Sequence, residues 1–165
     1  MTTTIYSKDK YTILSRNGIA NVLFNTITNQ HSLHANTAFN TGDIIVSFSA
    51  ATTQNYASYL TLQTGRGIHI TLEPSFLQYV NHSCNPNVFF DTSAMQLVCI
   101  SRVNRGDELC FFYPSAEWEM AQPFVCNCNS KNCLQLINGA RGLGAETIGK
   151  HRFTDFIEEQ IKQKR

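Results

Sequence analysis

The sequence predicts a mainly β domain that ends in a helix. Through about residue 115, short β-prone runs alternate with turn residues, and no regular succession of helices lies between them. No G-x-G-x-x-G motif accompanies these runs, which argues against a βαβ nucleotide-binding fold. Near the C terminus, apolar residues recur at helical spacing instead. A length of 165 residues suits one domain with a hydrophobic core.

The β-prone runs are short and are separated by turn signals. A Thr41-Gly42 turn precedes the third run, and an Asn-Arg-Gly-Asp turn precedes the last one. Such runs indicate small sheets rather than one long sheet. In chain order, they cover residues 11–14, 22–24, 43–48, 88–90, 97–100 and 108–113.

The last part of the chain predicts a helix of about 12 residues docked on the domain. Phe153, Phe156, Ile157 and Ile161 share one helical face, while acidic residues come early and basic ones late. The preceding stretch is rich in glycine, which indicates a loop or linker; its glycines are Gly139, Gly142, Gly144 and Gly149.

Charge and hydropathy exclude several classes of partner. The 13 Lys and Arg residues nearly balance 12 Asp and Glu, so no basic surface for nucleic acid or an anionic membrane is expected. No apolar run is long enough to span a bilayer, and residues 1–5 lack a signal-peptide core. We therefore expect an intracellular protein, cytoplasmic or nuclear and not secreted; the oligomeric state stays open.

The cysteines predict a metal site. Residues 126–133 have the form C-x-C-x4-C, which brings three thiols close together, and a tetrahedral zinc site needs a fourth ligand. Cys99 and Cys110 lie in apolar strand patterns, where a lone cysteine is usually a buried hydrophobe. Cys84 lies in a polar turn and is the strongest candidate, although three surface thiols without a metal are the alternative. The predicted ligands of one structural zinc are Cys84, Cys126, Cys128 and Cys133.

Three motifs carry a resemblance to a known family. Residues 78–87, Q-Y-V-N-H-S-C-N-P-N, resemble the signature R-F-I-N-H-S-C-x-P-N of SET-domain proteins. Residues 106–113, G-D-E-L-C-F-F-Y, are similar to the family's G-E-E-L-x-F-D-Y. Residues 124–133 resemble the post-SET motif F-x-C-x-C-x4-C. The resemblance covers roughly residues 10–138, in the family's order, and no cysteine-rich pre-SET region is present.

The resemblance implies the SET-domain fold, with several small curved, β-clip-like sheets and a knot-like C-terminal crossing. A post-SET zinc loop and a C-terminal helix would complete it. The implied division is a SET domain over residues 1–120, a post-SET zinc-binding segment over 121–138, and a linker with the C-terminal helix over 139–165. The crossing would bring Cys84 to the post-SET cysteines.

The resemblance also implies an activity, namely methyl transfer from S-adenosylmethionine to the ε-amine of a lysine in a protein or peptide, histone or other. In-line transfer needs a neutral amine, close approach and exclusion of water. Tyr113 matches the family's catalytic tyrosine, and Tyr59 matches a second channel tyrosine. Trp118 resembles an aromatic channel wall. Phe111 lies at the product-switch position, where Phe permits more than one methylation.

The sequence departs from the family pattern at Phe112, which replaces an acid, at Gln78, which replaces an arginine, and above all at the glycine motif of the implied cofactor site. The register places Gln30, His31 and Ser32 where the family has G-x-G, so side chains replace two glycines. The alternative to an active enzyme is therefore a catalytically weak SET module that binds a lysine-bearing peptide or protein. The implied cofactor-binding residues are Gln30, His31, Ser32, Tyr79, Asn81, His82, Tyr113 and Phe124.

Overall fold

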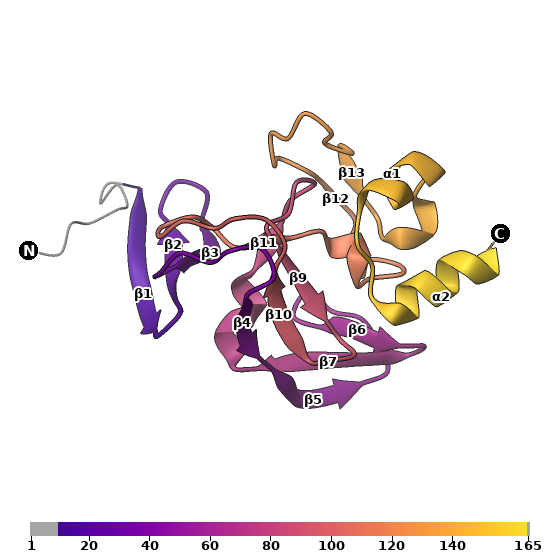
Figure 1. Cartoon of the computed structure of the whole chain (residues 1–165), viewed down its shortest axis with the longest axis horizontal. Coiled ribbons are helices and arrows are strands. Elements are labelled where there is room, and N and C mark those ends of the chain that lie inside the picture. Colours follow the sequence, from indigo (N-terminus) through magenta and orange to yellow (C-terminus); the bar gives the residue numbers. More distant parts are fainter. Residues whose placement is uncertain (1–9, 165) are drawn as a thin grey trace, which may run out of the picture.

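Small sheets make up most of the molecule between residues 10 and 164, the part of the chain that this computed structural model describes (Figure 1). Residues 1–9, which include the segment predicted to lack a signal peptide, and Arg165 lie outside the described residues. Within the described part, three sheets have three strands and two have two strands. The predicted mainly β class is confirmed.

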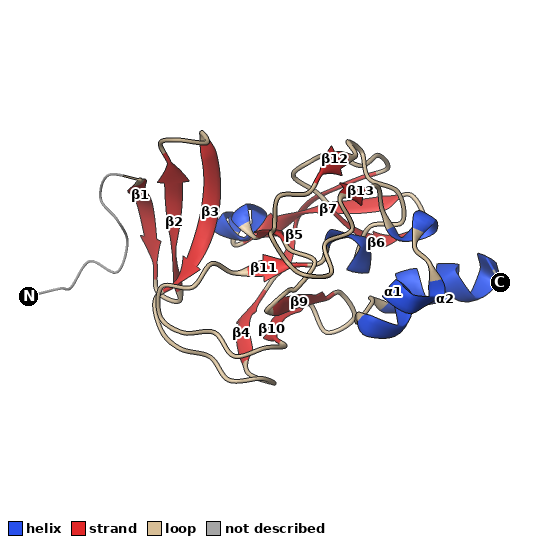
Figure 2. Cartoon of the chain, turned by 90° about the horizontal axis from the view of Figure 1, so that it is seen from above, coloured by secondary structure: helices blue, strands red, loops and turns tan. Residues whose placement is uncertain are grey.

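The first sheet lies at one end of the molecule (Figure 2) and has the antiparallel order β1-β2-β3. Its strands are β1 (Tyr11–Asn17), β2 (Ala20–Asn25) and β3 (Gln30–Ala35). Alternating residues of β2 and β3, such as Val22 and Leu33, are buried in the principal core, which fixes the register of the sheet. The first two strands match predicted runs.

The second sheet has the order β4-β10-β9 and joins distant parts of the chain. Strand β4 (Ile44–Ser47) pairs with β10 (Gln96–Cys99), which also pairs with β9 (Val88–Asp91). All three strands match predicted runs. Gly42, with φ at +96°, forms the turn that leads into β4, a conformation that suits glycine.

The third sheet was not identified from the sequence. It has the order β5-β7-β6, with β5 (Ser49–Gln54), β6 (Leu62–Gly65) and β7 (Ile68–Glu73). Strand β5 has small and polar residues that are mostly exposed, so it lacks the alternation that marks a half-buried strand. Its partner β7 is more buried and carries Ile70 and Leu72 into the core.

Two segments far apart in the sequence lie side by side at a pairing that we call the crossing, and its strand β11 lies in the middle of the molecule (Figure 2). Strand β8 (Asn81–His82), which follows the 3₁₀ helix η1 (Ser75–Tyr79), pairs in parallel with β11 (Cys110–Phe111). The strand predicted over residues 108–113 is therefore shorter than expected. Pro114 lies in the first turn of a 3₁₀ helix, η2 (Tyr113–Ser115), and lacks the N–H that a continuing strand would need.

The C-terminal part begins with a two-stranded hairpin, β12 (Phe124–Val125) and β13 (Leu136–Ile137). The 3₁₀ helix η3 (Ala140–Gly142) and two α-helices, α1 (Ala145–Lys150) and α2 (Asp155–Lys164), follow. Helix α2 confirms the predicted helix over ten residues. Helix α1 corrects the predicted loop, because its ion pair from Lys150 to Glu146 at 2.6 Å supports a helical turn despite Gly149.

Helix α2 is docked by a separate apolar cluster, in which Phe112 packs with Phe153, Ile157 and Ile161. Because Phe112 belongs to this cluster, the C-terminal helices pack against the segment next to Tyr113. No helix among residues 10–164 is long and apolar enough to cross a membrane.

Candidate active site and metal centre

Four thiols from two distant segments form one cluster. Cys84 follows β8, whereas Cys126, Cys128 and Cys133 lie between β12 and β13. Their sulfur atoms all lie within 4.8 Å of one another, and those of Cys84 and Cys126 are 4.0 Å apart. A tetrahedral zinc with Zn–S bonds of about 2.3 Å separates its sulfurs by about 3.8 Å, so the cluster could hold such an ion.

Hydrogen bonds fix Cys84 and Cys128 in this cluster. The backbone N–H of Leu134 donates to Sγ of Cys84 at 3.4 Å, and Sγ of Cys128 lies 3.2 Å from the hydroxyl of Ser130. Burial raises the pKa of Cys84 to about 11. Burial acts to raise the pKa of Cys128 as well, but hydrogen bonds, led by that of Ser130, lower it to about 6. Four thiolates this close together need a cation to offset their repulsion.

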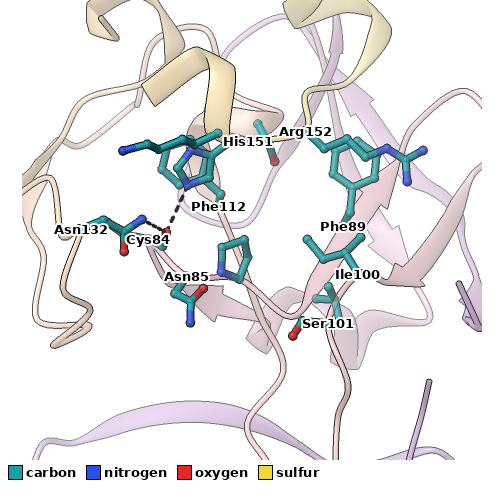
Figure 3. A pocket seen from close by; sticks show the side chains of 13 residues that line it. Cys84, Asn85, Phe89, Ile100, Ser101, Phe112, Asn132, His151 and Arg152 are labelled. Atoms are coloured by element: carbon teal, nitrogen blue, oxygen red, sulfur yellow. Dashed lines mark hydrogen bonds between the residues drawn. The ribbon is translucent and has the colours of Figure 1, made fainter. Parts of the chain in front are cut away.

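The carbonyl of Cys84 anchors the cluster to the C-terminal part of the chain. In Figure 3 the side chains of Asn132 and His151 both point at this oxygen, at 3.2 and 3.1 Å. The ring of His151 stacks on that of Phe112 with their centroids 3.9 Å apart. These side chains line a pocket of about 260 Å³ behind the cluster. The segment after α1 thus supports the thiol cluster.

A second cavity, of about 770 Å³, opens on the other side of the crossing. It lies between the start of β3, the loop before β6, β8, β11 and the segment that leads into β12. This volume falls in the usual range of small-molecule sites. The predicted site residues that line it are Gln30, His31, Tyr59, Tyr79, Asn81, His82, Phe111, Tyr113 and Phe124.

Tyr113 is held in this cavity by contacts with both crossing segments. Its hydroxyl donates to the carbonyl of Val80 at 3.4 Å. Its ring lies 4.7 Å from that of Phe111 and 5.9 Å from that of Phe124, between centroids. Burial raises the pKa of Tyr113, so its hydroxyl stays protonated and remains a hydrogen-bond donor. Although Phe111 and Tyr113 do not share a strand, their rings still meet.

His82 connects the cavity to the thiol cluster. Its Nδ1 accepts a hydrogen bond from the backbone N–H of Tyr113 at 3.2 Å. Nε2 must therefore carry the proton of the neutral ring, and it lies 3.4 Å from Sγ of Cys84. Burial, and then the nearby charge of His151, lower the pKa of His82 to about 4. The ring is thus neutral at pH 7 and bridges the two sites.

At the start of β3, the ring of His31 lies in the cavity wall next to Gln30, which stands where the resemblance expects a glycine. The side chain of His31 stacks on Tyr79 with their centroids 5.0 Å apart. The amide of Asn81 donates to the carbonyl of His31 at 2.7 Å and to Glu108 at 2.9 Å. This bridge ties β8 to β3 and forms the wall of the cavity there.

Two predicted site residues, Ser32 and Trp118, do not line the cavity. Ser32 is buried, and its hydroxyl is hydrogen-bonded to Nε2 of His34 at 3.0 Å. Trp118 is half-buried and packs with the cluster that docks helix α2. Tyr59 lies at the cavity but is 82% exposed, so it belongs to the rim rather than to the interior.

One cavity residue was missed from the sequence. Glu117 is buried and lines the cavity beside Tyr113. Its carboxylate accepts a hydrogen bond from the backbone N–H of Gln63 at 3.0 Å, while the side chain of Gln63 accepts one from the N–H of Trp118 at 2.9 Å. A single Glu between Ala and Trp gives no sequence signal of burial.

Comparison with known proteins decides the family. Residues 23–114, more than half of the chain, match the family profile described as SET domain. The chain belongs to the SET-domain family. The matched region of this SET-domain protein begins in β2 and ends in η2, so it includes both crossing segments and Cys84.

Relatives of this SET-domain protein include named methyltransferases. The methyltransferase flvH of Aspergillus flavus is 43% identical over 110 residues, which cover 65% of this chain and 61% of the relative. A Kluyveromyces lactis histone-lysine N-methyltransferase, H3 lysine-36 specific, is 29% identical over 60% of this chain and 15% of its own length. Human histone-lysine N-methyltransferase 2B is 26% identical over 43% of this chain and 3% of its own length. The chain therefore spans less than two thirds of these relatives.

Proposed function

We propose that this SET-domain protein transfers methyl groups from S-adenosylmethionine to the amine of a lysine in a protein or peptide. The observation that carries the proposal is the position of Tyr113, in a cavity lined by most of the residues that the family resemblance implies. The names of the relatives support methyl transfer, and those of the histone-lysine enzymes support a protein substrate, histone or other.

One part of the cavity suits the cofactor. S-adenosylmethionine supplies an electrophilic methyl group on a sulfonium centre. Phe124 offers a ring for the adenine. Strand β8 and the start of β3 offer backbone groups, and His31 and Tyr79 offer their rings. We assign cofactor binding to these segments, including Gln30, Asn81 and His82.

The other part suits a lysine side chain. Phe111 and Tyr113 form an aromatic floor, and Tyr59 lies at the rim. Aromatic walls desolvate an amine, which favours the neutral form that attacks carbon, and they tolerate methylated products. Phe111 has no hydroxyl to fix a water there, so we propose that more than one methyl group can be added. Trp118 packs away from this floor, and we assign it no role in the channel.

We further propose that the four thiols hold one structural zinc. A site with four thiolates leaves no open coordination position, so its role is to hold the post-SET segment 121–138 against the SET domain, residues 1–120. His151, in the segment after α1, supports the site through its hydrogen bond to the carbonyl of Cys84. The six free cysteines suit an intracellular compartment, nuclear or cytoplasmic, where thiols stay reduced.

A second candidate function, peptide binding without efficient catalysis, is favoured by the side chains of β3 that line the cavity. The stack of His31 on Tyr79 occupies the cavity wall at the motif where the resemblance expects two glycines. If these rings hinder the cofactor, the protein is a catalytically weak SET module that binds a lysine-bearing peptide or protein.

Calorimetry with S-adenosylmethionine separates the two candidates. The enzyme should bind one equivalent per chain, and His31→Gly should bind it at least as well, since the ring is removed from the wall. A purified, zinc-loaded protein that binds no S-adenosylmethionine but binds a lysine-bearing peptide would favour the second function.

A further inference from the structure

Glu117 is a buried acid without a cationic partner. Its side chain is 7% exposed, and its one hydrogen bond within the described chain comes from the backbone of Gln63. No ion pair of residues 10–164 includes it. Carboxyl groups are rarely buried unless a cation or several donors compensate them. A purely structural role therefore does not explain why this carboxyl is buried with a single hydrogen bond.

Burial has a measurable consequence for this group. It raises the pKa of Glu117 to about 8, and the hydrogen bond from Gln63 opposes that shift without cancelling it. A glutamine would accept the same hydrogen bond without the cost of burying a charge. The hydrogen bond from Gln63 therefore does not explain why this position carries an ionisable acid.

Glu117 belongs to the lining of the large cavity, as does Tyr113. The charge of Glu117 contributes to the raised pKa of Tyr113, which places the two groups within electrostatic range. Leu62, Leu72 and Phe111 line the cavity as well. Apolar walls with one carboxyl suit a ligand that has an aliphatic stem and a positive end.

Glu117 is the more buried of the two acids that line the cavity. Among the described lining residues, the acids are Glu117 and Glu108, and Glu108 accepts a hydrogen bond from Asn81 at 2.9 Å. The lining includes no Lys or Arg; its other titratable groups include the rings of His31 and His82 and the thiol of Cys110. A cation is thus the complement that this wall lacks.

We propose that Glu117 binds the substrate amine as its ammonium ion at the cavity wall. The inference rests on the proposed function, because it identifies which residue recognises the ammonium ion before that ion gives its proton to the carboxylate and the neutral amine accepts the methyl group. The ammonium ion forms a charge-assisted hydrogen bond to the carboxylate and supplies the cation that the buried acid lacks. Substrates with a neutral group at this position bind less tightly, since they form no charge-assisted hydrogen bond with the carboxylate.

The test uses n-butylamine, which has the length of a lysine side chain, and n-butanol as a neutral probe. Both are titrated by NMR at neutral pH into the full chain, with and without S-adenosylhomocysteine. Wild type should bind n-butylamine at least tenfold more tightly than n-butanol. Glu117→Gln, which keeps the acceptor for Gln63, should lose at least tenfold in n-butylamine affinity and keep its affinity for S-adenosylhomocysteine.

Equal n-butylamine affinity in wild type and Glu117→Gln, or no binding to wild type, overturns the proposal. If Glu117→Gln does not fold, the ¹³C carboxyl resonance of Glu117 in wild type gives the answer. Saturating n-butylamine should lower the pKa of Glu117 by about one unit or more, since each unit corresponds to a tenfold preference for the ionised acid. An unchanged pKa contradicts the proposal. Failure to bind S-adenosylhomocysteine would instead count against the proposed function, and the amine titration would still decide the role of Glu117.

Discussion

The backbone N–H of Tyr113 donates to Nδ1 of His82 at 3.2 Å, while the opposite nitrogen of the same ring lies 3.4 Å from Sγ of Cys84. One imidazole therefore joins the proposed catalytic tyrosine to the proposed zinc site. Parallel pairing of β8 with β11 brings these groups together, because it places His82 beside Phe111. The position of the tyrosine therefore depends on the crossing as well as on its own 3₁₀ helix η2.

Removing this acceptor should destabilise the crossing. His82→Ala leaves the N–H of Tyr113 without its partner, and an unsatisfied buried donor costs about 1–3 kcal/mol. His82→Asn is the matched control, because its side-chain oxygen can accept the same bond. Urea unfolding should show a larger loss of stability for His82→Ala than for His82→Asn. Equal losses would mean that the hydrogen bond to Tyr113 contributes little and that ring packing dominates.

The thiol cluster predicts one zinc per chain with Cys84 as a full ligand. Cys84→Ser and Cys128→Ser should both lower the zinc content of the purified protein, because each removes one of four thiolates. Cys99→Ala is the control, since Cys99 is buried outside the cluster. Elemental analysis measures the content directly. Full zinc retention by Cys84→Ser would remove Cys84 from the ligand set.

Much of this site could be predicted because short motifs determine it. The cysteine spacing and the polar turn around Cys84 predicted which four thiols meet, and the structure brings those four together. Strands rich in β-branched and aromatic residues, such as β9 and β10, were likewise identified. In both cases the residues themselves favour the outcome: thiols at this spacing can share a metal, and β-branched and aromatic residues favour strands.

The rest depends on tertiary contacts that leave no local signal. Strand β5 is mostly exposed and polar, so its pairing with β7 specifies it rather than its own sequence. Pro114 ended the predicted strand before Tyr113. The packing of Trp118 away from the cavity, and of Glu117 into it, follows from how Gln63 binds both residues.

The floor of the lysine site predicts a change in product distribution. Phe111→Tyr adds a hydroxyl beside Tyr113, where it can fix a water in the space that a second methyl group needs. We expect monomethylation to persist while di- and trimethylation decline. Mass spectrometry of a methylated substrate gives the distribution, with wild type measured in parallel. An unchanged distribution would show that Phe111 does not limit the product.

The buried acid predicts how stability depends on pH. The folded pKa of Glu117, about 8, lies above the usual value of 4.5, so the folded state holds a proton that the unfolded state has lost between these values. Stability should therefore fall as pH rises through this window, by up to about 1.4 kcal/mol per pH unit, and the fall should level off above it. Glu117→Gln should lack this contribution.

Urea unfolding of both proteins from about pH 5 to about pH 8.5 isolates the effect, because other groups cancel in the difference between wild type and variant. The difference should increase with pH in favour of Glu117→Gln. A constant difference across the range would show that Glu117 is not held neutral by burial.

Methyl transfer itself is the central claim. The purified, zinc-loaded protein is incubated with S-adenosylmethionine carrying a labelled methyl group and with an array of lysine-bearing peptides and proteins that includes histones. We predict label on lysine amines with wild type, and a loss of about 100-fold with Tyr113→Phe, because the missing hydroxyl no longer orients the amine and the methyl group. Full transfer by Tyr113→Phe, or no transfer by a wild-type protein that binds S-adenosylmethionine, would contradict the account.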